Sequence, residues 1–263
     1  MPFDQRDDAQ PGPIDWDEFH PTGPYDTYVR RTPPRRKWSL LLGIVLYFTA
    51  QYGVALILPP LLIQAGVISS RDALRLTSGG FTSWTFWILI VANVVAIVLI
   101  VAAVLWFYKE PLSSLGLTRE KVPRALLFGV AGFVVAFVAA TVVSIPIEQL
   151  VGVDPTQQAL SQTAMEPGLL PVLFLSAVLI APIAEEIVFR GYLYKAFRDR
   201  VKPGYAILLS SALFSFIHLE WRAFIPLFVI GIVLAYVYEK TGNLIAPITV
   251  HMLNNAVAFL WTP

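Results

Sequence analysis

The chain has 263 residues, of which 56% are hydrophobic and only 14% are charged, and its mean hydropathy is +0.66. This composition excludes an ordinary soluble domain and indicates a polytopic membrane protein, so the first expected partner is the lipid bilayer. The net charge of +1 argues against nucleic acid as a partner, because a nucleic-acid-binding surface needs clustered excess basic charge. Since the chain has no cysteine, disulfides, Cys-ligated metals and a thiol nucleophile are excluded as well.

Residues 1–37 differ in composition from everything that follows. They contain seven prolines up to Pro34, and seven acidic residues up to Asp26 against the single base Arg6. We predict that this segment is a disordered cytoplasmic tail. Five bases directly before the first apolar run indicate a topological anchor, with binding to anionic lipid as the alternative.

Seven apolar runs follow, most of them near the roughly 20 residues that a helix needs to cross the hydrocarbon core. The runs are Trp38–Leu62, Trp84–Tyr108, Pro123–Ile147, Leu169–Tyr192, Tyr205–Leu219, Ala223–Tyr238 and Leu244–Trp261. The sequence therefore predicts an all-α fold, a transmembrane bundle of about seven helices. We divide it into N-terminal transmembrane helices at residues 38–166 and a C-terminal block at residues 167–263.

The basic residues between these runs are unevenly distributed. If the segments alternate across the membrane from a cytoplasmic N-terminus, the inner ones hold Arg30, Arg31, Arg35, Arg36, Lys37, Lys109, Arg119, Lys121, Arg124, Lys195, Arg198, Arg200, Lys202 and Lys240, and the outer ones hold only Arg71, Arg75 and Arg222. Cytoplasmic loops of membrane proteins carry the excess of Lys and Arg. This fourteen-to-three bias predicts a cytoplasmic N-terminus and an outer C-terminus.

Three charged residues interrupt the fourth apolar run. Because Leu169–Ala184 contains no charge, a helix there carries Glu185 and Glu186 to membrane depth, where a lone carboxylate is costly. Glu186 and Arg190 stand four residues apart and pair on one helical face, whereas Glu185 points about 100° away. We therefore expect Arg190 to neutralise Glu186 and leave Glu185 for another partner. The alternative is a buried Glu–Arg pair that only fixes helix packing.

Two histidines also lie in apolar runs, while the third, His20, belongs to the N-terminal tail. His251 and Asn255 are four residues apart and share a helical face with each other, and His218 lies two runs earlier. A single membrane histidine usually makes a hydrogen bond between helices. Two histidines together with a Glu, however, are the ligand set of a hydrolytic zinc site, and also the set for water activation without a metal.

Three motifs occur in this order: Glu185-Glu186-x-x-x-Arg190, Phe214-x-x-x-His218, and His251-x-x-x-Asn255 preceded by Thr241-Gly-Asn-Leu-Ile-Ala-Pro-Ile248. Together they resemble the signature of the CPBP family, the CAAX-prenyl-protease and bacteriocin-processing intramembrane endopeptidases, also called the Abi or type II CAAX protease family. The resemblance covers about residues 167–261, and the first three runs match only in being apolar.

The resemblance implies an all-helical membrane endopeptidase whose polar cavity opens toward the cytoplasm and whose substrate is a peptide, prenylated or leader-bearing. It implies that Glu185 is the general base that activates a water together with His218. His251 and Asn255 would stabilise the oxyanion of the tetrahedral intermediate.

Within the same resemblance, Glu186 and Arg190 would order the site. A metalloprotease with Zn²⁺ on Glu185, His218 and His251 and a metal-independent glutamate protease both stay open. The alternative function is that of a non-enzymatic immunity or scaffold protein of the same family.

Counting residues along the predicted helices leaves one conflict. At about 1.5 Å per residue, Glu185 and His251 fall roughly 10 Å from the inner face, whereas His218, counted from Tyr205, lies roughly 20 Å deep. The three side chains converge only if the helix of His218 starts below the membrane surface, or if short or broken helices occur.

Overall fold

The computed structural model describes residues 37–78, 81–152 and 169–261. The predicted N-terminal tail, apart from Lys37, lies outside these ranges, and so does most of the segment between the predicted runs Pro123–Ile147 and Leu169–Tyr192. In the part of the chain that is described, every regular element is helical and no strand occurs, so the all-α prediction is confirmed.

The helices follow the predicted apolar runs closely. They are α2 (Leu40–Gln64), α3 (Ser70–Thr77), α4 (Ser83–Ala102) with its continuation η1 (Ala103–Phe107), η2 (Leu112–Leu115), α5 (Val122–Val151), the consecutive segments α7 (Leu169–Phe174), η3 (Leu175–Ile180), α8 (Ala181–Glu186), η4 (Ile187–Tyr194) and α9 (Lys195–Arg198), then α10 (Pro203–Ile217), α11 (Phe224–Thr241) and α12 (Ile245–Trp261). When consecutive segments are taken as one helix, five helices among the described residues are long and apolar enough to cross a membrane, and α10 and α12 are shorter apolar helices.

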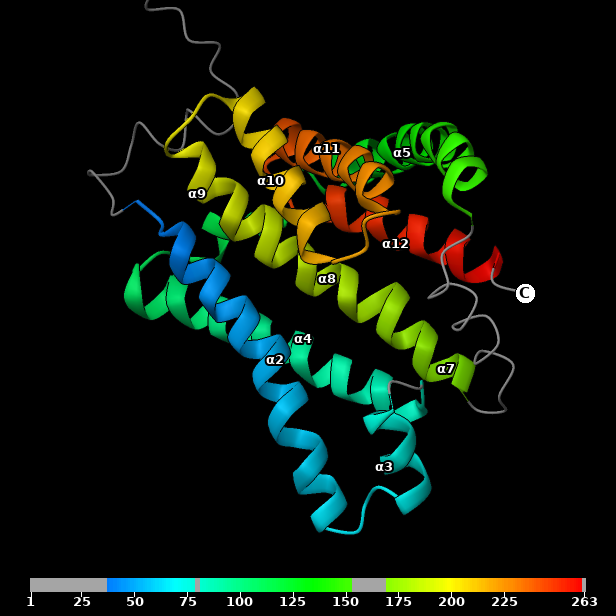
Figure 1. The fold of residues 1–263 in the computed structure, drawn as a ribbon. Coiled ribbons are helices and arrows are strands. Elements are labelled where there is room, and N and C mark those ends of the chain that lie inside the picture. Colours follow the sequence, from blue (N-terminus) through cyan, green and yellow to red (C-terminus); the bar gives the residue numbers. More distant parts are fainter. Residues whose placement is uncertain (1–36, 79–80, 153–168, 262–263) are drawn as a thin grey trace, which may run out of the picture. The chain divides into compact units, whose positions relative to one another are not determined.

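The segments α7 to α9 form one continuous rod, the central helix, over residues 169–198. It lies between two groups of helices: α2 and α4 pack on one side, and α10, α11 and α12 pack on the other (Figure 1). Its C-terminal half is accordingly highly enclosed, with every residue from Glu186 to Ala196 buried. Residues of α8 can therefore be reached by side chains from both groups.

The central helix extends six residues beyond the predicted end at Tyr192, which was therefore wrong. The charges that suggested an end are paired inside the protein, because Lys195 Nζ donates to Ser114 O (2.9 Å) and Arg198 lies 3.3 Å from Glu239. Counted from Arg198, Glu185 lies about 20 Å along the helix, and His218 lies about 22 Å from Pro203 by the same rise per residue. The conflict in depth between the two side chains disappears with this longer helix.

Helix α12 starts above a folded connector, defined here as residues Lys109–Lys121. Asn243 donates its amide to the carbonyls of Thr118 (3.2 Å) and Glu120 (2.9 Å), and Leu244 N donates to Gly116 O (3.0 Å). The Asn243 side chain also accepts from Ile245 N (2.9 Å), which satisfies an unpaired donor at the start of the helix. The connector thus fixes the height at which α12, and with it His251, begins.

A proline distorts the N-terminal half of the central helix. Pro182 has no N–H to donate, and its ring crowds the carbonyl four residues earlier. The turn before it is π-helical, with Ala181 N donating to Ser176 O. The carbonyl of Ala177 is thereby left without a main-chain donor, since its remaining neighbour in a π-helical pattern is Pro182.

Candidate active site

Glu186 and Arg190 form the buried pair that their spacing predicts. Arg190 NH1 lies 2.9 Å from Glu186 Oε1, and both side chains are fully buried. The other guanidinium nitrogen, NH2, donates to Gly231 O of α11 (3.3 Å), and the guanidinium carbon stands 4.4 Å from the ring centre of Phe214 on α10. The charge of Arg190 is thus met by a carboxylate, a carbonyl and an aromatic face, which makes its burial tolerable.

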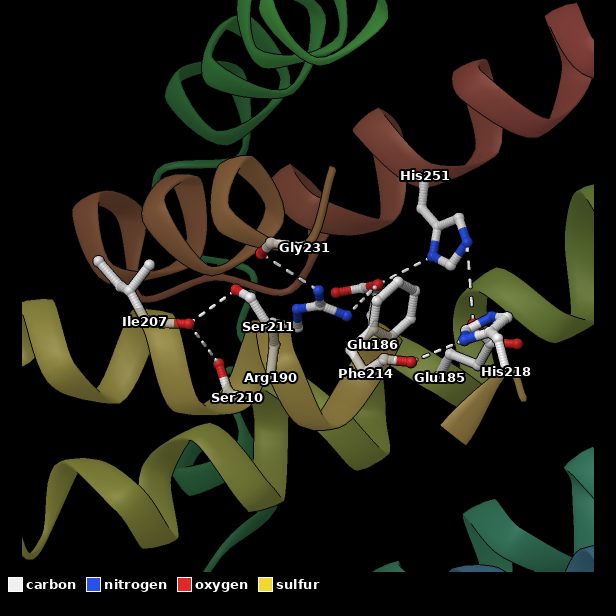
Figure 2. Close-up of polar contacts among 10 residues, drawn as sticks. All are labelled: Glu185, Glu186, Arg190, Ile207, Ser210, Ser211, Phe214, His218, Gly231 and His251. Carbon is white, nitrogen blue, oxygen red and sulfur yellow. Dashed lines mark hydrogen bonds and ion pairs between the residues drawn. The ribbon is translucent and has the colours of Figure 1, made fainter. Parts of the chain in front are cut away.

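The same Glu186 oxygen also holds His251. His251 Nδ1 lies 2.8 Å from Glu186 Oε1, and the His251 side chain is 7% exposed. Because an ionised carboxylate only accepts, we assign the proton of this bond to Nδ1, so that in the neutral ring Nε2 carries a lone pair. That nitrogen faces Glu185, and Nε2 lies 3.8 Å from Glu185 Oε2 (Figure 2).

His218 reaches the same carboxylate from α10. It is the C-cap residue of that helix, and its Nδ1 lies 2.7 Å from Phe214 O, a bond in which the nitrogen must donate. Its Nε2 therefore also carries a lone pair in the neutral ring, and it lies 3.9 Å from Glu185 Oε2. With 32% of its side chain exposed, His218 is the most accessible member of the group.

The structure thus brings Glu185, His218 and His251 together around one small space. Glu185 Oε2 is buried and makes no hydrogen bond to the described residues. When both imidazoles are neutral and Glu185 is ionised, Glu185 Oε2 and the two Nε2 atoms are all hydrogen-bond acceptors. A group between them must therefore be a hydrogen-bond donor or a cation. The separations of 3.8 and 3.9 Å are longer than direct hydrogen bonds.

Asn255 is placed differently from the other predicted site residues. It lies one turn beyond His251 on α12, and its Nδ2 donates to Ala177 O (2.9 Å). This is the carbonyl that Pro182 leaves without a main-chain donor, so Asn255 supplies the hydrogen bond that the central helix lacks at this point. An amide has a second N–H, and only that one is left for a substrate.

A metal ion fits the donor types of the site better than it fits their spacing. Zn²⁺ binds two imidazoles and a carboxylate at about 2.0–2.2 Å, and a tetrahedral ion would bring its ligand atoms to about 3.3 Å from one another. The distances of 3.8 and 3.9 Å are longer. Within residues 37–78, 81–152 and 169–261, no three His, Cys, Asp or Glu side chains are close enough to hold a metal ion.

The site is thus a carboxylate flanked by two imidazoles, set inside a bundle whose longest helices are long and apolar enough to cross a membrane. Residues 167–257 match the family model described as type II CAAX prenyl endopeptidase Rce1-like. This match and the relatives below support a membrane protease of the CPBP family, as the three sequence motifs predicted.

The relatives extend the similarity beyond the matched segment. The chain is 26% identical over 239 residues to the membrane-embedded CAAX protease MroQ of Staphylococcus aureus (strain USA300), which covers 86% of this chain and 90% of that protein. It is 24% identical over 223 residues to the YdiL protein of Bacillus subtilis (strain 168), with 84% and 86% covered. No solved structure matches the chain with significant similarity.

Two contributors to the site were not predicted from the sequence. The Gly231 carbonyl accepts from Arg190, and the Ala177 carbonyl accepts from Asn255, and neither main-chain group has a sequence signal of its own. A signal for the second existed in Pro182, because a proline inside a helix always leaves a carbonyl without its donor. Phe214 was part of a motif, and its ring and carbonyl now explain why it stands four residues before His218.

Proposed function

We propose that this protein is an endopeptidase in which Glu185 activates a water for attack on a peptide bond. The observation that supports the proposal is the convergence of Glu185 Oε2, His218 Nε2 and His251 Nε2 on one space. A water there would donate one hydrogen to Glu185 and the other to an imidazole, which orients its oxygen lone pairs away from the three acceptors. A substrate carbonyl carbon in line with those lone pairs would be attacked.

The reaction balances with this set of residues. As the water oxygen bonds to the carbonyl carbon, the carbonyl electron pair moves to oxygen and Glu185 takes the proton of the water. When the C–N bond breaks, the same proton passes from Glu185 to the leaving nitrogen. To donate to the oxyanion, His251, fixed by Glu186, would bind a proton from solvent at Nε2 before the reaction and keep it throughout, and the second N–H of Asn255 would assist.

We extend the proposal to the substrate and to the side of the membrane. MroQ is a CAAX protease by name, and the matched family model is that of a prenyl endopeptidase, so a lipid-modified or leader-bearing peptide is the expected substrate. The excess of Lys and Arg on the segments between alternate helices supports a site that opens to the cytoplasm.

The proposal also states what a metal would do. Zn²⁺ held by Glu185, His218 and His251 would act as a Lewis acid on the substrate carbonyl and the attacking water. Because the ligand atoms stand further apart than a tetrahedral zinc site needs, we favour the reaction without it. Cleavage that survives extensive chelation supports the glutamate mechanism, and activity restored only by added Zn²⁺ supports the metal.

The deciding experiment compares peptides released by membranes that contain the wild type or Glu185→Gln. An amide keeps the volume of the side chain but does not accept the proton of the water, so the released peptides should disappear with the variant. Equal amounts of both proteins in the membrane are the necessary control. Identical peptide profiles from the two would contradict the proposal and favour the non-enzymatic alternative.

A further inference from the structure

One polar side chain packs beside the part of the central helix that carries Glu185, and it comes from outside the segment that matches the family model. Tyr47 of α2 packs against Phe189, four residues after Glu185, whereas the family match covers only residues 167–257. Side chains from both helix groups therefore contact this part of the central helix or its carboxylate: the histidines come from α10 and α12, and Tyr47 comes from α2.

Packing between α2 and the central helix explains why Tyr47 points there. Gly43 lies directly against Tyr192, since a Cβ on Gly43 would come within 2.5 Å of that ring. One turn further along α2, the ring of Tyr47 packs edge-on against Phe189, with ring centres 5.5 Å apart. Phe189 stands four residues from Glu185, about one turn, so the face of the central helix that contacts α2 also carries Glu185.

The hydroxyl of Tyr47 is available for a ligand. It makes no hydrogen bond to any residue that the structure describes. Although the Tyr47 side chain is partly buried, its oxygen is not among the sealed polar atoms of the described residues. Inside a membrane bundle a hydroxyl without a partner is costly, and polar groups at this depth usually face a functional cavity.

The position of Tyr47 is fixed on both sides along α2. Below it, Ser39 N donates to Tyr108 Oη (2.7 Å) and Tyr192 Oη donates to Ser39 O (3.1 Å). Above it, Gln51 Nε2 donates to Asn93 Oδ1 of α4 (3.2 Å). These bonds hold the stretch of α2 that carries Tyr47, and a donor on a fixed helix requires little reorganisation during a reaction.

We propose that Tyr47 is a catalytic residue that donates its hydroxyl proton in a hydrogen bond to the carbonyl oxygen of the scissile peptide. The proposal rests on the proposed function, because it assigns a donor to the oxyanion that the Glu185-activated water creates. The bond strengthens as the carbonyl electron pair moves to oxygen, and the proton stays on Tyr47 throughout. It supplements Asn255, one N–H of which is engaged with Ala177 O.

The test is steady-state kinetics of the full-length protein in proteoliposomes. The probes are a quenched fluorescent peptide with an S-farnesylated C-terminal CAAX sequence and the same peptide without the lipid. Tyr47→Phe keeps the ring against Phe189 and removes only the hydroxyl. It should lower kcat about 100-fold, the loss typical of one oxyanion donor, and leave KM and the melting temperature unchanged.

Tyr52→Phe is the matched control. It removes a hydroxyl from the same helix at a side chain that is exposed on the outer surface of the bundle, so its kinetics should equal those of the wild type. A peptide aldehyde that carries the same sequence gives a second readout, because its hydrate resembles the tetrahedral intermediate. Tyr47→Phe should weaken inhibition by the aldehyde by the same factor by which it lowers kcat/KM. In the Glu185→Gln protein, Tyr47→Phe should leave binding of the uncleaved peptide unchanged.

The outcomes separate the two proposals. Wild-type kcat in Tyr47→Phe, or a change in KM or thermal stability alone, overturns the role of Tyr47 and leaves the peptidase proposal intact. If the wild type and Glu185→Gln behave alike on both peptides, the proposed function fails and the role of Tyr47 fails with it.

Discussion

His251 Nδ1 lies 2.8 Å from Glu186 Oε1, so a carboxylate of the central helix fixes an imidazole of α12. The same oxygen binds Arg190 at 2.9 Å. Glu186 is therefore more than the neutralised partner of Arg190, because it also sets the orientation and the tautomer of a histidine that faces Glu185. The two adjacent carboxylates therefore have different surroundings: Glu186 holds Arg190 and His251, and Glu185, the proposed base, makes no hydrogen bond through its Oε2 atom to the described residues.

The Glu pair should respond unequally to neutralisation. Glu185→Gln should abolish cleavage and leave the melting temperature near that of the wild type. Glu186→Gln leaves Arg190 without its ion pair in a fully buried position, and breaking such a pair costs on the order of 3–5 kcal/mol. Its loss of activity should come with a lower melting temperature in detergent.

Thermal unfolding and peptide cleavage of both variants, measured side by side, decide the point. Equal destabilisation by the two substitutions would mean that Glu185 also serves the fold.

Asn255 and Pro182 should be coupled in stability. Asn255→Ala removes the donor of the Ala177 carbonyl, and a buried carbonyl left without a donor costs about 1–3 kcal/mol. Pro182→Ala restores a main-chain N–H on the central helix, so it supplies an alternative donor to this turn. Asn255→Ala should therefore destabilise the Pro182→Ala protein less than it destabilises the wild type.

A double-mutant cycle in chemical denaturation measures this coupling. Additive effects would indicate that the bond between Asn255 and Ala177 does not respond to the proline, and the explanation of the π-helical turn would be wrong.

Two glycines of α2 should respond to alanine with opposite signs. Gly43 lies against Tyr192, where a Cβ would approach the ring to 2.5 Å, whereas a Cβ on Gly53 would meet no atom within 4 Å. Gly53→Ala should stabilise the protein by up to about 1 kcal/mol through helix propensity. Gly43→Ala should destabilise it, because α2 must move away from the central helix.

The melting temperatures of the two variants provide the comparison, and cleavage by Gly43→Ala adds a second one. A Gly43→Ala protein as stable as Gly53→Ala would show that α2 is not held at this contact.

The bias of basic residues predicts that the C-terminus lies outside. A reporter that is active only beyond the membrane, fused after Pro263, should be active, and a fusion within the connector between Lys109 and Lys121 should be silent. A reporter after Pro263 that reads as cytoplasmic would contradict the combination of a cytoplasmic N-terminus and an odd number of crossings.

Much of the helix order could be predicted from the sequence, because apolar runs at membrane length leave few alternatives. Helix ends were less predictable. Lys195 and Arg198 looked like the polar flank of a span, yet contacts with distant residues extend the helix through them. The eight-residue helix α3 was missed because it is short and polar, and its start is stabilised by the Ser69 side chain, which accepts from Asp72 N.

Contacts within one helix were predictable from the number of residues between the two partners, as for Glu186 and Arg190. Contacts between helices were not, because they depend on helix rotation and depth. The bond from His251 to Glu186 and the bond from Asn255 to Ala177 are of this kind. Residue types indicated a shared site for Glu185, His218 and His251, and only the three-dimensional arrangement supplies its distances.

The connector at residues 109–121 has a consequence for dissecting this protein. Its carbonyls accept from Lys195, Asn243 and Leu244, and Leu115 O accepts from the hydroxyl of Tyr238 (3.0 Å). A fragment that starts at residue 167 would contain every predicted site residue and yet lose all of these acceptors at once. The segment recognised by sequence comparison is thus not a transplantable module, and a split version of the enzyme should work only when both pieces are made in the same membrane.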